Sequence, residues 1–297
     1  MKAKDELTII EIVNKSTNFL SSKGIESAKS EVEWILSSVL ETSRVQLYLD
    51  HENVVPKDKV NSVRNMVIQR GKRTPLQHIL GNTIFLGMPI KCDSRALVPR
   101  METEQMVEQI VDKISNSLDG HVVDLGTGTG AILLSLCNTL ENSTGTGYDN
   151  SLQAIELAKE NLIGKKCEKR VGFELLDWNE LTPDALGTFA NLVVSNPPYL
   201  TESEWSESMP EVKEYDPKSA LVAGENGLAD IISVIKISST LLSRDGLLVM
   251  EIGAGQAHLI DTTVKSYYTH FEYTKDFLGV RRFLWASKTS KFPWQKA

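Results

Sequence analysis

The chain has 297 residues, 41% of them hydrophobic, which is enough for one large domain with its own core and a smaller one. Its formal net charge of -7 at pH 7 does not suit a surface built for phosphate backbones, so nucleic acid is not the default partner. The three cysteines, Cys92, Cys137 and Cys167, are widely spaced, which indicates a reducing compartment and argues against a zinc or disulfide framework.

The N-terminal residues include acidic side chains and lead into no apolar run long enough for a signal sequence or a membrane span. A transit peptide would be rich in Arg and poor in acids, unlike this one. We therefore expect a cytoplasmic protein with no membrane partner.

Residues 1–78 carry apolar side chains at helical spacing. Three stripes are visible: Ile9, Ile10, Val13 and Leu20; then Val32, Ile35, Leu36, Val39 and Leu40; then Val60, Val63 and Val67. Each set places its members on one helical face, which is typical of core packing. The segment is predicted to be a small helical bundle without a cofactor site.

Residues 79–95 are expected to link this bundle to the rest of the chain. Short apolar runs on either side of Gly87 predict a hairpin there. A helical pattern follows through Val107 and Ile114, and Thr103 or a neighbour is expected to cap its N-terminus.

From residue 121 the predicted strands alternate with helices. Strands are expected at 121–125, 145–149, 171–176, 192–195, 247–252 and 282–285, and helices at 131–140, through Ile155 and Leu162, along a stretch ending at Leu242, and over 258–268. Such alternation is typical of a doubly wound sheet, so we predict an α/β fold for residues 96–297. The polar tail from Ser287 onward is expected to be loosely held.

A glycine-rich loop, Gly126-Thr127-Gly128-Thr129-Gly130, follows the first of these strands. Glycines let the backbone pass close to a ligand, and the helix that starts after them directs its N-terminal amides toward it. The spacing is weak evidence, because Gly126, Gly128 and Ala131 also satisfy a dinucleotide-binding pattern.

Acidic residues stand at the ends of three predicted strands: Asp124, Asp149 and Asp177. Asp124 would repel the phosphates of a dinucleotide but attract a ligand ammonium. Asp149 stands where a ribose-binding acid is expected, and Asp177 can accept from an adenine amine. S-adenosylmethionine has all three parts and is the predicted cofactor. The expected cofactor contacts are Asp124, Gly126, Thr127, Gly128, Gly130, Asp149, Asn150, Asp177, Trp178 and Asn196, with no metal ligands.

The run Asn196-Pro197-Pro198-Tyr199 ends a β-branched apolar strand. Two prolines that cannot join a ladder make the loop stiff. The Asn196 side-chain oxygen and the Pro197 carbonyl are acceptors, and Tyr199 adds an aromatic face, a combination that suits a planar NH2 group. An ordinary strand-to-turn junction is the alternative for this string by itself.

With the loop Asp124–Gly130, this motif resembles class I methyltransferases that act on planar NH2 groups. Four further segments resemble the HemK/PrmC family of protein-glutamine methyltransferases, over nearly the whole chain. They are Pro75–Gly81, Val98–Glu104, Asp216–Leu221 and Glu251–Gln256.

The resemblance implies methylation of the side-chain amide of the glutamine in the Gly-Gly-Gln motif of class 1 peptide chain release factors. Apart from the resemblance, the acidic charge balance predicts no direct binding of nucleic acid, and we expect a monomer. The resemblance also implies catalytic roles for Asn196, Pro197 and Tyr199, with Pro198 beside them in the substrate site. Met101, Asp216 and the pair Ala190-Asn191 depart from the family pattern, which affects the expected loop geometry.

Three other functions stay open on the sequence. A relative in the same family could methylate a ribosomal protein, and the same loop geometry could serve an exocyclic amine of adenine in nucleic acid. The chain could also be a non-catalytic binding module that keeps the cofactor fold.

Overall fold

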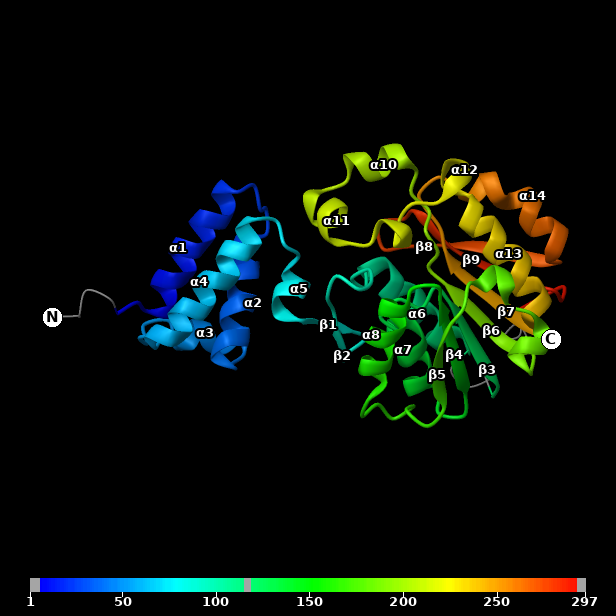
Figure 1. The fold of residues 1–297 in the computed structure, drawn as a ribbon, viewed down its shortest axis with the longest axis horizontal. Coiled ribbons are helices and arrows are strands. Elements are labelled where there is room, and N and C mark those ends of the chain that lie inside the picture. Colours follow the sequence, from blue (N-terminus) through cyan, green and yellow to red (C-terminus); the bar gives the residue numbers. More distant parts are fainter. Residues whose placement is uncertain (1–5, 115–118, 293–297) are drawn as a thin grey trace. The chain divides into compact units, whose positions relative to one another are not determined.

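A computed structural model describes residues 6–114 and 119–292 (Figure 1). The chain divides into two compact units, Met1–Gly81 and Asn82–Ala297. None of the helices in the described ranges is long and apolar enough to cross a bilayer.

The first unit is helical, as predicted. Its helices are α1 (Ile9–Ser22), α2 (Ala28–Leu40), α3 (Arg44–Leu49), α4 (Lys57–Gly71) and α5 (Leu76–Leu80). The predicted stripes supply its core, except that Ile10 is 40% exposed. A buried ion pair between Arg70 of α4 and Glu31 of α2 ties two of these helices together. Because a buried charge is costly without its partner, this pair fixes how the two helices align.

The predicted hairpin around Gly87 is present and belongs to the second unit. Strands β1 (Asn82–Phe85) and β2 (Met88–Lys91) pair antiparallel through the two-residue turn Leu86-Gly87, whose φ values are +48° and +73°. Two positive φ values give the turn the right twist for a tight hairpin. The amide of Lys91 donates to Asn161 Oδ1 of α8 at 2.7 Å, which attaches the hairpin to the sheet domain.

The second unit is built on a seven-stranded sheet with the order β5-β4-β3-β6-β7-β9-β8. Its strands are β3 (His121–Leu125), β4 (Thr144–Asp149), β5 (Val171–Leu175), β6 (Ala190–Ser195), β7 (Leu242–Glu251), β8 (His270–Lys275) and β9 (Arg281–Ser287). β3 to β7 are parallel, whereas β9 runs antiparallel to both of its neighbours. This is the predicted doubly wound α/β fold.

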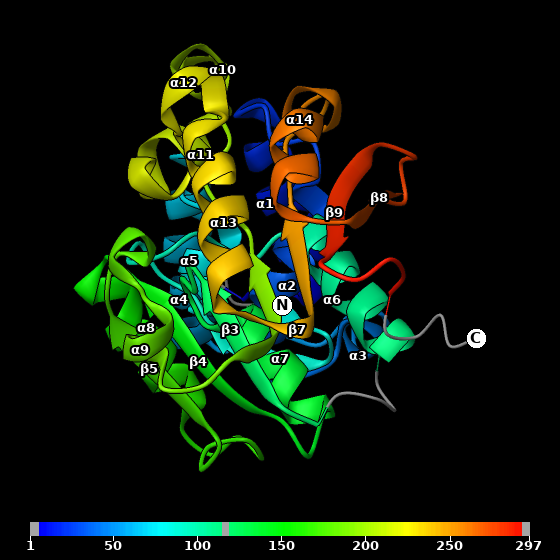
Figure 2. The ribbon, with the colours of Figure 1, turned by 90° about the vertical axis from the view of Figure 1, so that its right-hand side faces the viewer.

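Helices cover both faces of the sheet because its strands carry apolar residues on both sides. On β3, Val122 packs with one cluster and Val123 with the other. The first face is covered by α6 (Met101–Ile114), α7 (Ala131–Thr139) and α8 (Leu152–Leu162), and the second by α13 (Ala229–Leu241) and α14 (Ala257–Tyr267). Figure 2 shows α13 and α14 side by side.

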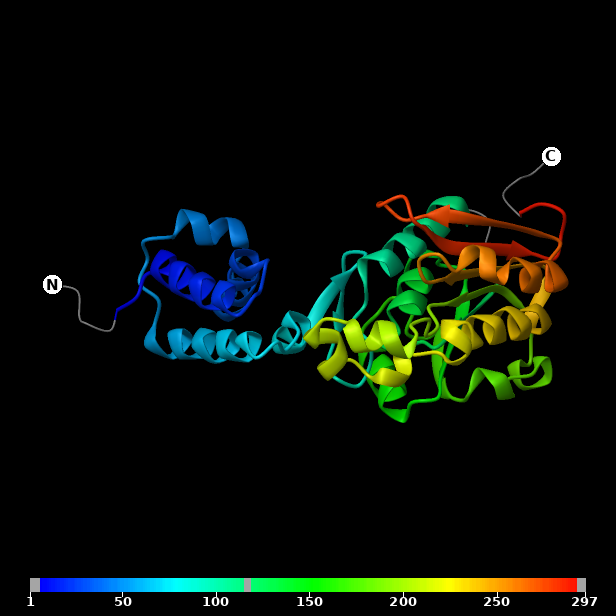
Figure 3. The same ribbon diagram turned by 90° about the horizontal axis from the view of Figure 1, so that it is seen from above.

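Two expectations about the C-terminal half are wrong, and one strand was not predicted. The stretch from residue 201 to Leu242 is not one long helix, because prolines and glycines divide it into α10 (Glu202–Glu207), α11 (Pro210–Tyr215), η2 (Lys218–Ala220), α12 (Gly224–Gly227) and α13. Strand β8 was not predicted, and with β9 it forms the hairpin that edges the sheet (Figure 3). The tail is not loose at Phe292, which is 1% exposed with its ring centroid 4.5 Å from that of His270. Two short elements, η1 (Trp178–Glu180) and α9 (Pro183–Leu186), follow β5.

Candidate active site

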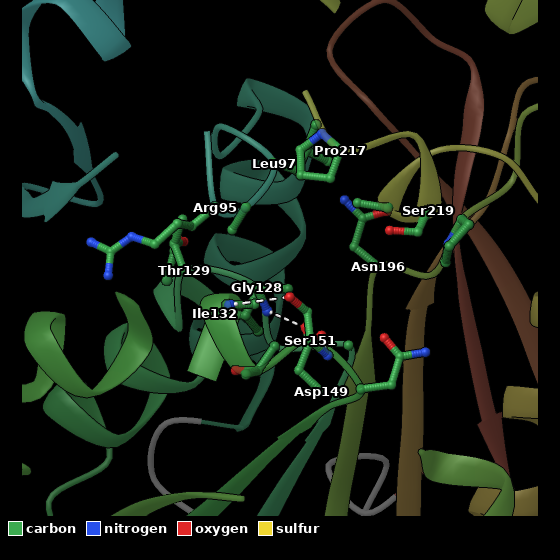
Figure 4. Close-up of a pocket in the computed structure, with 18 of the residues that line it drawn as sticks. Arg95, Leu97, Gly128, Thr129, Ile132, Asp149, Ser151, Asn196, Pro217 and Ser219 are labelled. Carbon is green, nitrogen blue, oxygen red and sulfur yellow. Dashed lines mark hydrogen bonds between the residues drawn. The ribbon is translucent and has the colours of Figure 1, made fainter. Parts of the chain in front are cut away.

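Two loops meet at the carboxyl edge of the sheet, where the strand order reverses. β3 and β6 are parallel neighbours, but the chain leaves β3 toward one side of the sheet and β6 toward the other. A ligand site in an open α/β sheet lies at such a switch point. The glycine loop after β3 and the Asn196 loop after β6 line one pocket there (Figure 4).

The glycine loop is folded against the end of β4. The amides of Gly126 and Thr127 both donate to the Tyr148 carbonyl at 2.9 Å. Gly126 and Gly128 have φ values of +76° and +53°, which residues with side chains seldom adopt. This conformation brings the loop backbone to the pocket wall.

Asp149 is fixed at the end of β4 by backbone amides. Its Oδ2 accepts from Gly128 N and its Oδ1 from Ser151 N, each at 2.9 Å, as the dashed lines in Figure 4 show. Partial burial raises the pKa of this carboxyl, and the two amides oppose that rise. Each carboxylate oxygen still has a lone pair that can accept a hydrogen bond from a ligand hydroxyl group.

One end of the pocket is lined by both acidic and apolar side chains. Asp177 caps η1, its Oδ1 accepting from Asn179 N at 2.9 Å, and the buried Trp178 donates through Nε1 to Ser233 at 3.2 Å. Asp230 of α13, which the sequence reasoning missed, also lines this end.

This arrangement fits S-adenosylmethionine. The paired oxygens of Asp149 match two ribose hydroxyls, the carboxylate of Asp177 matches an exocyclic amine, and Ile132 and Ala154 offer apolar surface for a purine. Asn150, another predicted contact, also lines the pocket. Gly126 and Gly128 line the pocket without side chains, so a ligand has room to lie against the backbone of the glycine loop.

Two predicted cofactor residues lie behind the pocket wall. Asp124 is fully buried and accepts from Thr127 Oγ1 at 2.7 Å, while its Oδ1 has no hydrogen-bond partner among the described residues. Burial, with the nearby Asp149 charge, raises the pKa of Asp124 to about 7. Gly130 faces Phe173 rather than the pocket. Asp124 therefore shapes the loop through Thr127, and its contact with a ligand ammonium stays a prediction.

The Asn196 loop is held at several points. Ser195 Oγ donates to the Leu125 carbonyl at 2.7 Å, which joins the ends of β6 and β3. Asn196 and Pro198 line the pocket, whereas Pro197 is buried and Tyr199 turns away. The Tyr199 carbonyl accepts from Gln256 Nε2 at 3.0 Å.

Two residues that the sequence reasoning did not place in the site connect to this loop. Asn196 Nδ2 donates to Thr103 Oγ1 at 2.9 Å, and Thr103 donates to Glu251 Oε2 at 2.7 Å. Thr103 lies within the first turn of α6, so it is not the predicted N-cap. Tyr199 donates its hydroxyl to Glu251 Oε1 at 3.1 Å. Glu251 is the last residue of β7, as Asp149 is the last residue of β4, and an acid at the end of a strand is the signal that could have identified it.

Two of the three departures from the family pattern, Met101 and Asp216, can be explained by their surroundings. Met101 is 71% exposed at the start of α6, so no packing there depends on it. Asp216 is buried, and its Oδ2 lies 2.6 Å from Arg100 Nη2, which extends over the pocket. Asp is therefore long enough to make this ion pair.

The sheet order and the two loops define a class I methyltransferase fold. A solved structure titled "hMettl16 catalytic domain in complex with MAT2A 3'UTR hairpin 6" shares this fold with a TM-score of 0.57 at 15% identity, over 82% of this chain and 87% of that one. Residues 101–212 match the methyltransferase small domain family, and residues 11–81 match the PrmC N-terminal domain family.

Curated relatives show to which family of methyltransferases the chain is similar in sequence over most of its length. Release factor glutamine methyltransferase of Fusobacterium nucleatum is 34% identical over 95% of this chain and 79% of its own length. That of Geobacter sulfurreducens is 33% identical over 88% of this chain and 89% of its own length. The chain belongs to the family of release factor glutamine methyltransferases.

Proposed function

We propose that this protein transfers a methyl group from S-adenosylmethionine to the side-chain amide nitrogen of the glutamine in the Gly-Gly-Gln motif of class 1 peptide chain release factors. The family membership supports the reaction and the substrate. The observation that carries the proposal to particular residues is the position of Asn196, at the edge of the same pocket whose acids and glycine loop fit the cofactor.

The chemistry requires alignment rather than a strong base. An amide nitrogen is a poor nucleophile because its lone pair is delocalised into the carbonyl. If Asn196 Oδ1 and the Pro197 carbonyl accept its two N–H groups, the nitrogen is held with its lone pair directed at the pocket. S-adenosylmethionine, when bound, supplies a sulfonium methyl group as the electrophile. Formation of the N–C bond would be matched by cleavage of the bond between the methyl carbon and the sulfonium sulfur, which would leave a neutral thioether. One N–H proton would be lost late, to solvent or to a nearby acceptor.

The charge distribution favours a protein substrate over nucleic acid. Residues 82–297, which contain the pocket, have 20 Lys or Arg against 29 Asp or Glu. A surface that binds phosphate backbones needs the opposite balance. Methylation of an adenine amine is therefore the less favoured use of this loop.

The helical unit is proposed to recognise the release factor, because one glutamine side chain offers little binding area. We also propose that the enzyme works as a monomer in the cytoplasm, where its substrate acts.

The test is a radiolabelled methyl-transfer assay with purified class 1 release factor and its Gln→Ala variant in the Gly-Gly-Gln motif. A ribosomal protein fraction and adenine-containing DNA and RNA serve as competing substrates. Label that appears on the release factor and vanishes with the Gln→Ala change is the expected result. Label on nucleic acid or on ribosomal protein would overturn the substrate, and label nowhere would favour a binding module.

A further inference from the structure

A continuous set of hydrogen bonds connects Asn196 to the buried carboxylate of Glu251. It runs from Asn196 through Thr103 to one oxygen of Glu251, and the other oxygen holds Tyr199. The members come from the loop after β6, from α6 and from the end of β7, so they meet only in the folded protein. Glu251 is 1% exposed and Thr103 is 5% exposed.

Counting protons fixes the direction of every bond in this set. An ionised carboxylate only accepts, so the single hydroxyl protons of Thr103 and Tyr199 both point to Glu251. Thr103 then has no proton left for Asn196 and can only accept from it. The Asn196 carboxamide must therefore present Nδ2 to Thr103, which leaves Oδ1 for the pocket.

We infer that Glu251, acting through Thr103, is a positioning residue that sets the direction of the Asn196 carboxamide and anchors Tyr199. This inference rests on the proposed function, because Oδ1 is useful only if an N–H of the substrate amide is to be held. If the Asn196 carboxamide were turned by 180°, its NH2 group would face the N–H group of the substrate amide. Two donors do not form a hydrogen bond, so the substrate amide would not be aligned.

The protonation state of Glu251 controls the direction of the Asn196 carboxamide. A protonated Glu251 can donate to Thr103, which frees the Thr103 proton for Asn196 Oδ1 and permits the turned carboxamide. Burial raises the pKa of Glu251 to about 7, with a further rise from Glu102 of α6. The hydrogen bonds from Thr103 and Tyr199 and the charge of Arg282 on β9 oppose the rise. Activity should therefore increase as pH rises through about 7.

The first measurement uses the unliganded protein. Nuclear magnetic resonance of the side-chain NH2 of Asn196, assigned by its loss in Asn196→Asp, should show a pH titration with a midpoint near that of Glu251. The titration should disappear in Glu251→Gln. An NH2 signal that does not respond to pH between 5 and about 9 would overturn the inference, and this result does not depend on activity.

The second measurement separates positioning from structure. Thr103→Val should lower kcat by about 10- to 100-fold with the Kd for S-adenosylmethionine unchanged, and Thr103→Ser should restore kcat. Thr274→Val is the matched control, because Thr274 also donates one bond, to Gln109 at 2.6 Å, and accepts one, from Trp285 at 2.9 Å, but belongs to β8. Its kcat should equal that of the wild type.

Equal kcat values for Thr103→Val and the wild type would also overturn the inference. A wild-type enzyme that labels no release factor would instead refute the proposed function, while the titration of the Asn196 signal would still test the positioning by Glu251. If Thr103→Val does not fold, the wild-type titration and the pH profile of Glu251→Gln decide. That profile should lose the rise near pH 7.

Discussion

The carboxamide of Asn196 donates through its nitrogen to Thr103, and no described residue donates to its oxygen. That asymmetry separates a residue that caps a turn from one whose oxygen is free to accept a hydrogen bond from a substrate N–H group. Asp149 shows the same feature, since backbone amides hold its two oxygens while leaving lone pairs for a ligand.

Asn196→Ala should lower kcat by about 100- to 1,000-fold, because one of the two acceptors for the substrate amide is lost. The Kd for S-adenosylmethionine, measured by calorimetry, should stay close to that of the wild type. Loss of cofactor binding together with turnover would show that Asn196 has a structural role instead.

Glu251→Gln should change how stability depends on pH. The pKa of Glu251 is about 7 in the folded protein against an ordinary value of 4.5, so the folded state binds the proton more tightly. The stability that this proton gives is fully present below about pH 4.5 and is lost as pH rises through about 7. Glutamine cannot ionise and avoids this loss.

The difference in free energy of unfolding between Glu251→Gln and the wild type should therefore shift toward the variant by up to about 3 kcal/mol from pH 5 to pH 8. Urea denaturation at several pH values measures it. Asp124 has a raised pKa in both proteins and cancels in the comparison. If the difference in free energy of unfolding does not change with pH, the pKa of Glu251 is not raised in the folded protein.

At the scale of elements, the site is the junction of β3 and β6. The glycine loop turns the chain from β3 into α7, and Ser195 closes the neighbouring end of β6 against β3. Gly130 lies at that turn with φ of +80°, and a Cβ there would be 2.8 Å from the Phe173 ring. The close approach of α7 to the sheet therefore depends on this glycine.

Gly130→Ala should destabilise the second unit by about 1 to 3 kcal/mol, from a strained φ and a clash with Phe173. Gly172→Ala on β5 is the control, because a Cβ there meets no atom within 4 Å and its φ is not positive. We expect the control to unfold within about 0.5 kcal/mol of the wild type. Equal effects of the two changes, measured by urea denaturation, would refute this account of Gly130.

At the scale of the whole molecule, each unit has its own hydrophobic core. The core of the first unit uses only residues between Leu7 and Leu80, and the two clusters around the sheet use only residues from Phe85 onward. A unit with a separate core can fold by itself. The pocket is lined only by residues 95–230, so it belongs entirely to the second unit.

Removal of residues 1–81 should therefore leave cofactor binding nearly intact while raising KM for the release factor. Steady-state kinetics with varied release factor, together with calorimetry of S-adenosylmethionine binding, measures the two effects. If both constants worsen by the same factor, the helical unit supports the fold instead of recognising the substrate.

The sequence patterns correctly predicted most of the helices and strands. Strict alternation of strands and helices predicted the parallel part of the sheet, and the glycine loop and the Asn-Pro-Pro-Tyr string marked the two loops that line the pocket. β8 was missed because its residues are only partly buried, so its apolar pattern is weak. The broken helices after residue 201 were missed because apolar spacing alone does not show where caps and turns end a helix.

The sequence by itself determined the class of fold, the two loops of the site and the family, because these depend on local periodicity and on contiguous motifs. Only the tertiary structure decided that Thr103 and Glu251 hold Asn196 and Tyr199, since these residues are up to 148 positions apart. It also decided that Asp124 and Gly130 lie behind the pocket wall. The physical reason is that hydrogen-bond partners and burial arise from strand order and packing, and parallel strands bring distant residues to one edge of the sheet.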